Sequence, residues 1–351
     1  MKIIIAIDSF KGSASSQELN QAVKKGLLAI RSDAEIQTFE IADGGEGTIS
    51  ALQHGLGGEL ISVETVDLLE RPITANYLFL PNQTALIEAA EVVGIDKITP
   101  SPETITNATT KGLAALFIDA KNRGAREIVL SLGGTGTSDG GLGLLQGLGG
   151  SFEELPKLEN VKITGLADVT NVYAGETGYA KFFGKQKGGT LELLEQQNEN
   201  AQKVAQSIKE KHQIDLQAIA GTGAAGGLGG AVVLLGGTVE AGFPKIAQLL
   251  NIEKAIQSAD LVITGEGRMD IQSANGKVPY GMAQLARKYG LPTIAFCGAL
   301  SDNLGKMDEV LLASFSIQRS AISLDEAMKK ERTLENIERL TKNVMKTWLY
   351  Q

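Results

Sequence analysis

The feature that most constrains this chain is a recurring junction in which a short apolar, β-favouring run meets a polar, glycine-rich loop. The first run, Ile3–Ile7, leads into the loop 8–13, after which apolar residues recur at helical spacing. Ser15 and Glu18 form a capping-box pattern, so a helix is expected to begin near Ser16 and to point its positive dipole end at the loop. Strand, loop and helix in this order are typical of an α/β protein.

The same junction occurs twice more. The run 36–41 leads into the loop 42–48, and the run 127–132 leads into the glycine loop 133–141. Near the end of the chain, the segment 259–296 reads as a complete βαβ unit. The chain has 42 glycines, several of which cluster in these loops, and clustered glycine in an α/β chain suggests loops that cradle an anion.

The middle of the chain has a different pattern. Short β-like runs at 60–66, 73–80 and 84–87 are separated by turn signals and indicate a group of antiparallel strands. Helices are predicted at about 101–123 and 191–212. This change of pattern predicts a second domain.

We therefore expect an α/β fold of two domains. A doubly wound, flavodoxin-like domain with a parallel sheet would be formed by residues 1–60 and 240–351, and an inserted α/β domain with antiparallel strands by residues 61–239. The active site is expected in the cleft between the two domains, where ligands commonly bind.

The charge balance excludes some partners. The net charge is -8 and the sequence pI is about 5.1, which argues against a nucleic-acid or membrane partner because phosphates would be repelled. The single cysteine, Cys297, is expected to be a buried thiol, and the apolar run in Met1–Asp8 is too short for a signal peptide. These features predict a cytoplasmic location.

Lys11 is the first candidate site residue. In a loop between a strand and a helix it could bind a phosphate together with backbone N–H groups. The structural alternative is an ordinary solvated lysine. The residues expected to approach an anion such as phosphate in this loop and in the loop 133–141 are Ser9, Gly12, Ser13, Gly133, Gly134, Thr135 and Gly136.

Carboxylates form the second candidate group. Asp43 and Glu46 lie on a tight glycine loop, where they could hold Mg²⁺ or accept a hydroxyl proton. Asp139 lies where a helix should begin and could meet phosphate oxygens or a metal, or could simply cap the helix. Asp270 joins Asp43 and Glu46 as a candidate metal ligand.

The segment Glu266–Asp270 places a cation, Arg268, between acids at a strand end, and Lys277 opens the following helix. Arg268 could bind a carboxylate with its planar fork, and Lys277 could bind phosphate. The alternative is a surface ion-pair cluster that contributes little to stability.

Besides an enzyme that binds phosphate groups through these loops, two function classes stay open at this point. The pattern Gly221-x-Gly223-x-x-Gly226, after an expected strand at 214–220, motivates an NAD(P)-dependent dehydrogenase of a small hydroxy acid, although the required acidic residue is missing at the usual distance. A non-catalytic nucleotide or sugar-acid binding protein is the third reading. No Walker-type lysine motif occurs, and neither histidine has metal-ligand spacing.

Taken together, the ordered blocks resemble those of the bacterial glycerate kinase family along essentially the whole chain. The blocks are Asp8-Ser-Phe-Lys-Gly-Ser13, Ala42-Asp-Gly-Gly-Glu-Gly-Thr48, 133–141, Asp168-Val-Thr-Asn171 with Gln186-Lys-Gly188, 223–229, and Gly265-Glu-Gly-Arg-Met-Asp270 with Gly276-Lys277.

This resemblance implies ATP- and Mg²⁺-dependent phosphorylation of D-glycerate, with 2-phosphoglycerate as the more usual product. We expect Lys11, Asp43, Asp139, Arg268 and Lys277 to act in catalysis and Asp43, Glu46 and Asp270 to hold the metal. The resemblance also implies that the loop residues expected to approach an anion, together with Gly223, Gly226 and Gly265, bind the nucleotide. Small molecules are the expected partners, and homo-oligomerisation stays open.

Overall fold

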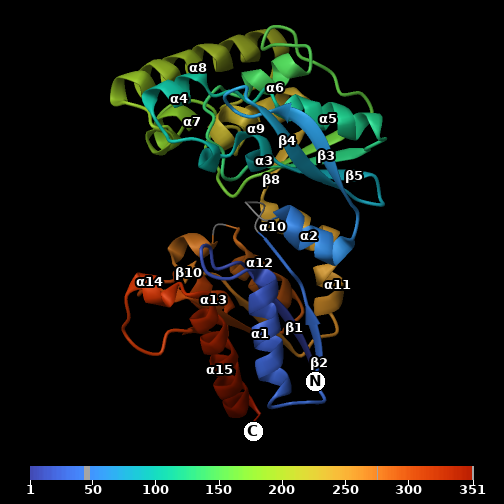
Figure 1. Cartoon of the computed structure of the whole chain (residues 1–351), viewed down its shortest axis with the longest axis vertical. Coiled ribbons are helices and arrows are strands. Elements are labelled where there is room, and N and C mark those ends of the chain that lie inside the picture. Colours follow the sequence, from blue (N-terminus) through green and yellow to red (C-terminus); the bar gives the residue numbers. More distant parts are fainter. Residues whose placement is uncertain (43–47, 275, 350–351) are drawn as a thin grey trace. The chain divides into compact units, whose positions relative to one another are not determined.

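The computed structural model describes residues 1–42, 48–274 and 276–349. The chain divides into two compact units, coloured along the sequence in Figure 1. Unit 1 comprises the described residues within Met1–Asp43, Ser50–Leu56 and Phe243–Gln351. Unit 2 comprises those within Gly44–Ile49 and Gly57–Gly242.

Unit 1 is built on a parallel sheet of five strands in the order β13-β11-β9-β1-β2. The strands are β1 (Lys2–Ile7), β2 (Glu35–Thr38), β9 (Leu261–Gly265), β11 (Thr293–Cys297) and β13 (Ala313–Ser316). Numbered along unit 1 alone, this is the order 2-1-3-4-5 of flavodoxin-like folds. The order reverses between β1 and β9, which pair with Ile3 opposite Leu261.

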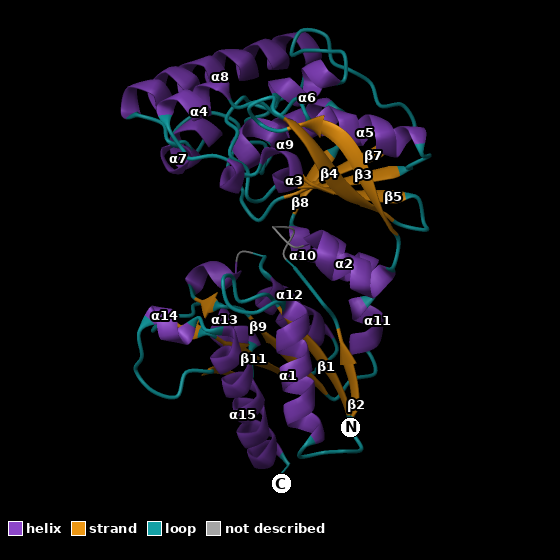
Figure 2. Cartoon of the chain, viewed as in Figure 1, coloured by secondary structure: helices purple, strands orange, loops and turns teal. Residues whose placement is uncertain are grey.

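The helices of unit 1, purple in Figure 2, come from both ends of the chain, as the sequence colours of Figure 1 show. They are α1 (Ser16–Leu28), α2 (Thr48–Leu56), α10 (Gly242–Leu249), α11 (Ile252–Ile256), α12 (Val278–Lys288), α13 (Met307–Val310), α14 (Leu324–Ala327) and α15 (Lys330–Trp348). The predicted capping box is present: Ser15 accepts from the Glu18 N–H, and Glu18 accepts from the Ser15 N–H. α1 and α15 approach closely at Gly26, where a Cβ would lie 2.7 Å from the Glu338 carbonyl oxygen.

Unit 2 contains a mixed sheet of six strands in the order β3-β4-β5-β6-β7-β8. The strands are β3 (Glu59–Val66), β4 (Pro72–Phe79), β5 (Thr84–Glu88), β6 (Glu127–Ser131), β7 (Lys162–Leu166) and β8 (Thr238–Glu240). β3, β4 and β5 pair antiparallel, whereas β5 to β8 pair parallel. The predicted group of antiparallel strands is therefore confirmed, and so is the two-domain α/β fold class.

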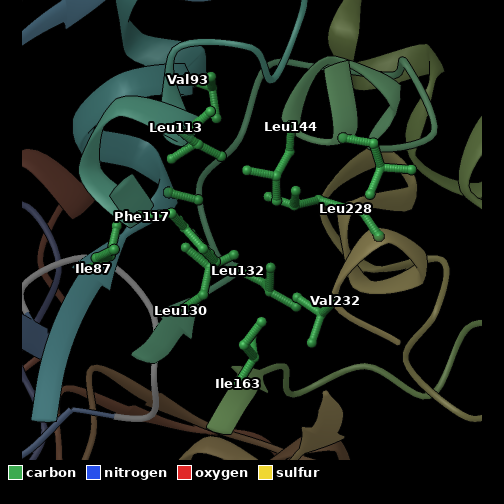
Figure 3. Packing of buried hydrophobic residues seen from close by; sticks show 14 of the residues in the cluster. Ile87, Val93, Leu113, Phe117, Leu130, Leu132, Leu144, Ile163, Leu228 and Val232 are labelled. Atoms are coloured by element: carbon green, nitrogen blue, oxygen red, sulfur yellow. The ribbon is translucent and has the colours of Figure 1, made fainter. Parts of the chain in front are cut away.

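The helices of unit 2 are α3 (Ala89–Val93), α4 (Pro102–Asn107), α5 (Leu113–Asn122), α6 (Leu142–Gly147), α7 (Tyr179–Phe183), α8 (Leu191–His212) and α9 (Ala224–Leu234). Their apolar faces meet the sheet in one core, in which Phe117, Leu130, Leu144 and Val232 converge from different elements (Figure 3). Burial of this apolar surface is the main driving force for folding of the unit.

Two local predictions were wrong. The helix expected at 101–123 is two helices, because the segment between them is held by tertiary bonds: Thr109 donates its N–H to Leu68, and Thr110 donates to Asp139. The expected strand at 214–220 is absent, because Gln217 instead exchanges side-chain hydrogen bonds with the Ala174 backbone. Among the described residues, no helix combines the length and the apolar character needed to cross a bilayer.

Candidate active site

A cavity of about 700 Å³ lies in unit 1 at the carboxyl ends of β1, β9 and β11; we call it the Lys11 pocket. The point between β1 and β9, where the strand order reverses, is where ligands bind in such sheets. The predicted residues that line this pocket are Ser9, Lys11, Ser13, Arg268 and Lys277. The structure thus brings together, in one cavity, side chains that are distant in sequence.

The loop carrying Lys11 is a tight turn. Phe10 donates its N–H to the Ala14 carbonyl oxygen at 2.9 Å, and Ser13 donates back to Phe10 at 2.8 Å. Gly12 closes the turn with a φ of 75°, a left-handed conformation that favours glycine. The turn leaves the Lys11 side chain exposed at the mouth of the pocket.

Glu266 is the buried acid of the Lys11 pocket, with 6% of its surface exposed. Its Oε2 lies 3.4 Å from Lys277 Nζ, while Oε1 has no hydrogen-bond partner among the described residues. Burial raises the pKa of Glu266, and Ser273 and Lys277 oppose that rise. The sequence did not single out Glu266, because its burial is a tertiary property.

Arg268 and Asp270 do not form the surface ion-pair cluster that was the alternative reading. Arg268 is exposed and makes no ion pair within the described ranges. Asp270 is half-buried, accepts the Gln272 N–H at 2.8 Å and donates its own N–H to Ser273. Asp270 therefore holds a turn and does not line the Lys11 pocket.

The predicted metal ligands cannot be assembled from the described residues. Asp43 and Glu46 lie outside these residues, and no group of three acidic, histidine or cysteine side chains suited to a metal occurs within them. Asp8 and Glu266 nevertheless both line the Lys11 pocket and are both buried. Mg²⁺ commonly uses only one or two carboxylates together with substrate phosphates, so this pair and the orphaned Oε1 of Glu266 fit such an ion.

A second cavity, of about 310 Å³, lies in unit 2 at the carboxyl ends of β6 and β7; we call it the Lys187 pocket. The predicted residues Gly133, Gly134 and Thr135 line it. Their loop is fixed by hydrogen bonds with the end of α3 and the segment that follows it: Ile95 donates to the Gly134 carbonyl oxygen at 2.9 Å, and Gly136 donates to the carbonyl oxygen of Val93, the last residue of α3, at 2.8 Å. Gly136 itself is not among the lining residues.

Two charged residues of the Lys187 pocket were missed by the sequence analysis. Lys187 is 3% exposed and lies in the 3₁₀-helix η2 (Lys185–Lys187), and Asp168 follows β7. Both belong to the sequence blocks that carry the family resemblance. No local pattern, however, shows that a lysine in a polar segment is buried.

Asp139 lines neither pocket. Its carboxylate accepts the Thr110 N–H at 2.8 Å and hydroxyl at 2.9 Å, as well as the N–H groups of Gly141 and Gly143 at the start of α6. These bonds favour the structural alternative, in which Asp139 anchors the helix start. A catalytic role for Asp139 stays a prediction without support from this geometry.

Three predicted nucleotide-binding glycines are packing positions. A Cβ on Gly223 would lie 2.2 Å from the Val172 carbonyl oxygen, and one on Gly226 would lie 2.0 Å from that of Thr137. A Cβ on Gly265 would lie 1.8 Å from the Phe296 carbonyl oxygen. Because no strand precedes Gly221, the dinucleotide fingerprint also lacks its structural context, which removes the observation that motivated a dehydrogenase.

Comparison with known proteins confirms the family resemblance. The model of the "Glycerate kinase family" matches residues 3–157 and 153–349. A glycerate kinase from Bacillus cereus is 36% identical, with 99% of this chain and 98% of the relative covered, and a glycerate 2-kinase from Escherichia coli is 34% identical over the same shares. A crystal structure from Salmonella typhimurium LT2, described as a candidate glycerate kinase 2, superposes with a TM-score of 0.85 at 32% identity, covering 99% of this chain and 98% of that one.

Proposed function

This chain belongs to the glycerate kinase family and is a kinase, and we propose that it transfers the γ-phosphoryl group of ATP to a hydroxyl group of D-glycerate. The products are ADP and phosphoglycerate, and we favour 2-phosphoglycerate because a relative that is 34% identical is named a glycerate 2-kinase. The cytoplasm is the proposed location.

The observation that carries this proposal is the set of cations in the Lys11 pocket. Lys11 comes from the loop after β1, Arg268 from the short strand β10 (Arg268–Met269) that follows β9, and Lys277 from the N-cap position of α12, although the chain as a whole is acidic. Phosphoryl transfer depends mainly on positioning and on neutralising charge, and three convergent cations provide both. The cavity of about 700 Å³ lies well within the range of roughly 300–1,000 Å³ typical of ligand pockets.

Each residue has a proposed role. Lys11 and Lys277 bind phosphate oxygens, and the turn containing Ser9, Gly12 and Ser13 approaches the nucleotide. Arg268, for which the sequence suggested the substrate carboxylate, lies beside the two lysines in the same pocket, so phosphate oxygens suit it equally well. The sequence predicted Asp43 or Asp139 as the base that accepts the hydroxyl proton. Because the Asp139 carboxylate is occupied by hydrogen bonds from Thr110, Gly141 and Gly143, we favour Asp43, which lies outside the described residues.

Asp8 and Glu266 would hold Mg²⁺ in this pocket. Of the ligands predicted from the sequence, Asp270 does not line the pocket, and Asp43 and Glu46 lie outside the described residues. When bound, the ion supplies positive charge that stabilises the transferring phosphoryl group. Glu266 suits this task because burial excludes water from its carboxylate, and Lys277 holds one of the two oxygens at 3.4 Å.

A coupled assay of ADP release tests the proposal directly. D-glycerate should stimulate ADP release from MgATP, and phosphorus NMR of the product should show the phosphoryl group on the 2-hydroxyl. Release of ADP that does not depend on D-glycerate would contradict the substrate assignment, and a product phosphorylated at the 3-hydroxyl would contradict the regiochemistry. Reduction of NAD(P) by the same substrate would instead support the dehydrogenase.

A further inference from the structure

Lys187 is a buried cation without a described counter-ion. Only 3% of its surface is exposed, and its Nζ donates to the Thr137 carbonyl oxygen at 2.6 Å and approaches Thr135 Oγ1 at 3.5 Å. Both partners are uncharged. Within the part of the chain that the structure describes, no carboxylate forms an ion pair with Lys187.

A buried ammonium group of this kind is costly unless an anion compensates it. Burial lowers the pKa of Lys187 to about 8, so the side chain still carries its charge at neutral pH. Asp139 opposes the shift, but its carboxylate is already occupied by hydrogen bonds from Thr110 and from the start of α6. The described residues of unit 2 therefore leave the positive charge of Lys187 uncompensated, and an external anion could compensate it.

The cavity at Lys187 indicates what kind of anion fits. The Lys187 pocket has a volume of about 310 Å³, at the small end of the range of roughly 300–1,000 Å³ for ligand pockets. Its polar wall includes Thr135, Asp168 and Gln186, whereas Leu132 and Leu166 give it an apolar floor. A small acid with hydroxyl groups matches this mixture, and the Lys11 pocket, at about 700 Å³, is the better match for a nucleotide.

We propose that the Lys187 pocket binds the carboxylate of the small hydroxy acid that this kinase phosphorylates, with Lys187 as the counter-ion of that carboxylate. The identity of the acid as D-glycerate rests on the proposed function, whereas the capture of a carboxylate by Lys187 does not. The substrate hydroxyls face Thr135 and the glycine loop at Gly133 and Gly134. Arg268 is then free to act on phosphate oxygens in the Lys11 pocket.

Isothermal titration of the full chain with D-glycerate, without nucleotide, tests this assignment. Lys187→Met keeps the apolar stem but removes the charge, and we expect it to weaken D-glycerate binding at least tenfold while ADP binding changes little. Lys185→Met is the matched control, because Lys185 is exposed on the same short helix, and it should bind D-glycerate normally. Unchanged D-glycerate affinity in Lys187→Met, or a selective loss of ADP binding, would overturn the proposal.

Ligand-induced thermal stabilisation of the wild type provides a second measurement that does not depend on the variant folding. D-glycerate and glycolate, which both carry a carboxylate and a hydroxyl, should raise the melting temperature, whereas glycerol at the same concentration should not. Equal stabilisation by glycerol would overturn the role of the carboxylate. Stabilisation by glycolate without any D-glycerate-dependent ADP release would support the pocket and contradict the proposed function, so the two failures are distinguishable.

Discussion

Lys187 Nζ lies 2.6 Å from the carbonyl oxygen of Thr137, a residue whose own hydroxyl is buried and has no hydrogen-bond partner among the described residues. The lysine thus fixes the loop after β6 through one backbone oxygen. It does so at the expense of burying a charge, because burial lowers its pKa to about 8 while Asp139 opposes the shift. Asp168 lines the same pocket.

This burial predicts a pH dependence of stability. Between pH 8 and 10.5 the unfolded chain keeps the Lys187 proton that the folded chain has lost, so stability rises with pH across this window. Relative to that of Lys187→Met, the free energy of unfolding of the wild type should rise by about 3 kcal/mol between pH 8 and pH 10.5. Urea unfolding at several pH values measures this rise. Curves for the two proteins that stay parallel would show that Lys187 titrates normally.

Lys11→Ala should lower kcat about 10²–10³-fold, the usual effect of removing one group that stabilises charge in a transition state. The fold should be unaffected, because the side chain is exposed. Steady-state ADP release measures the loss, and circular dichroism checks the fold. Lys306→Ala, at another exposed lysine of unit 1, is the control and should retain full turnover. A Lys11 variant with kcat within about threefold of the wild type would remove Lys11 from the phosphate site.

Glu266→Gln tests the buried acid of the Lys11 pocket. Because burial raises the pKa of Glu266, its charge opposes folding as the pH rises through that pKa, and the variant should be at least as stable as the wild type at neutral pH. Its kcat should fall and the Mg²⁺ concentration for half-maximal rate should rise. Glu335→Gln, on the exposed face of α15, should change neither. A Glu266→Gln enzyme that keeps both rate and Mg²⁺ requirement would exclude Glu266 as a ligand of the ion.

The sequence predicted those parts of the fold that local patterns encode. The capping box at Ser15 and the helix 191–212 were found because side-chain periodicity and caps are local signals. The break between α4 and α5 was missed because Asp139, distant in sequence, draws Thr110 out of the helix. Helix propensity does not report such a tertiary bond.

The residues of the candidate site also divide into those that a local sequence pattern predicts and those that depend on tertiary structure. Lys11 and Lys277 could be inferred from their places between strands and helices, whereas Lys187 and Glu266 could not, because what distinguishes them is burial of a charge. Glycine was ambiguous for a related reason. A missing Cβ permits the approach of a ligand or of another part of the chain, and only the structure shows that Gly226 meets the Thr137 backbone.

This ambiguity can be resolved by substitution at Gly226. Its φ is 67° and a Cβ would lie 2.0 Å from the Thr137 carbonyl oxygen. Gly236, just beyond α9, has a φ of 80° but would place its Cβ in open space. Alanine at either position carries a backbone penalty of roughly 1–2 kcal/mol, and only Gly226→Ala adds the cost of overpacking, about 1–3 kcal/mol.

Gly226→Ala should therefore unfold at a lower urea concentration than Gly236→Ala, with the difference reporting packing alone. The carbonyl that the new Cβ would displace is the one that accepts from Lys187, so the loss should extend to D-glycerate binding. ADP affinity of the folded fraction should be unchanged, since Gly226 acts through the Thr137 loop. If the two variants prove equally stable and Gly226→Ala loses ADP binding instead, Gly226 contacts the nucleotide, as the sequence first suggested.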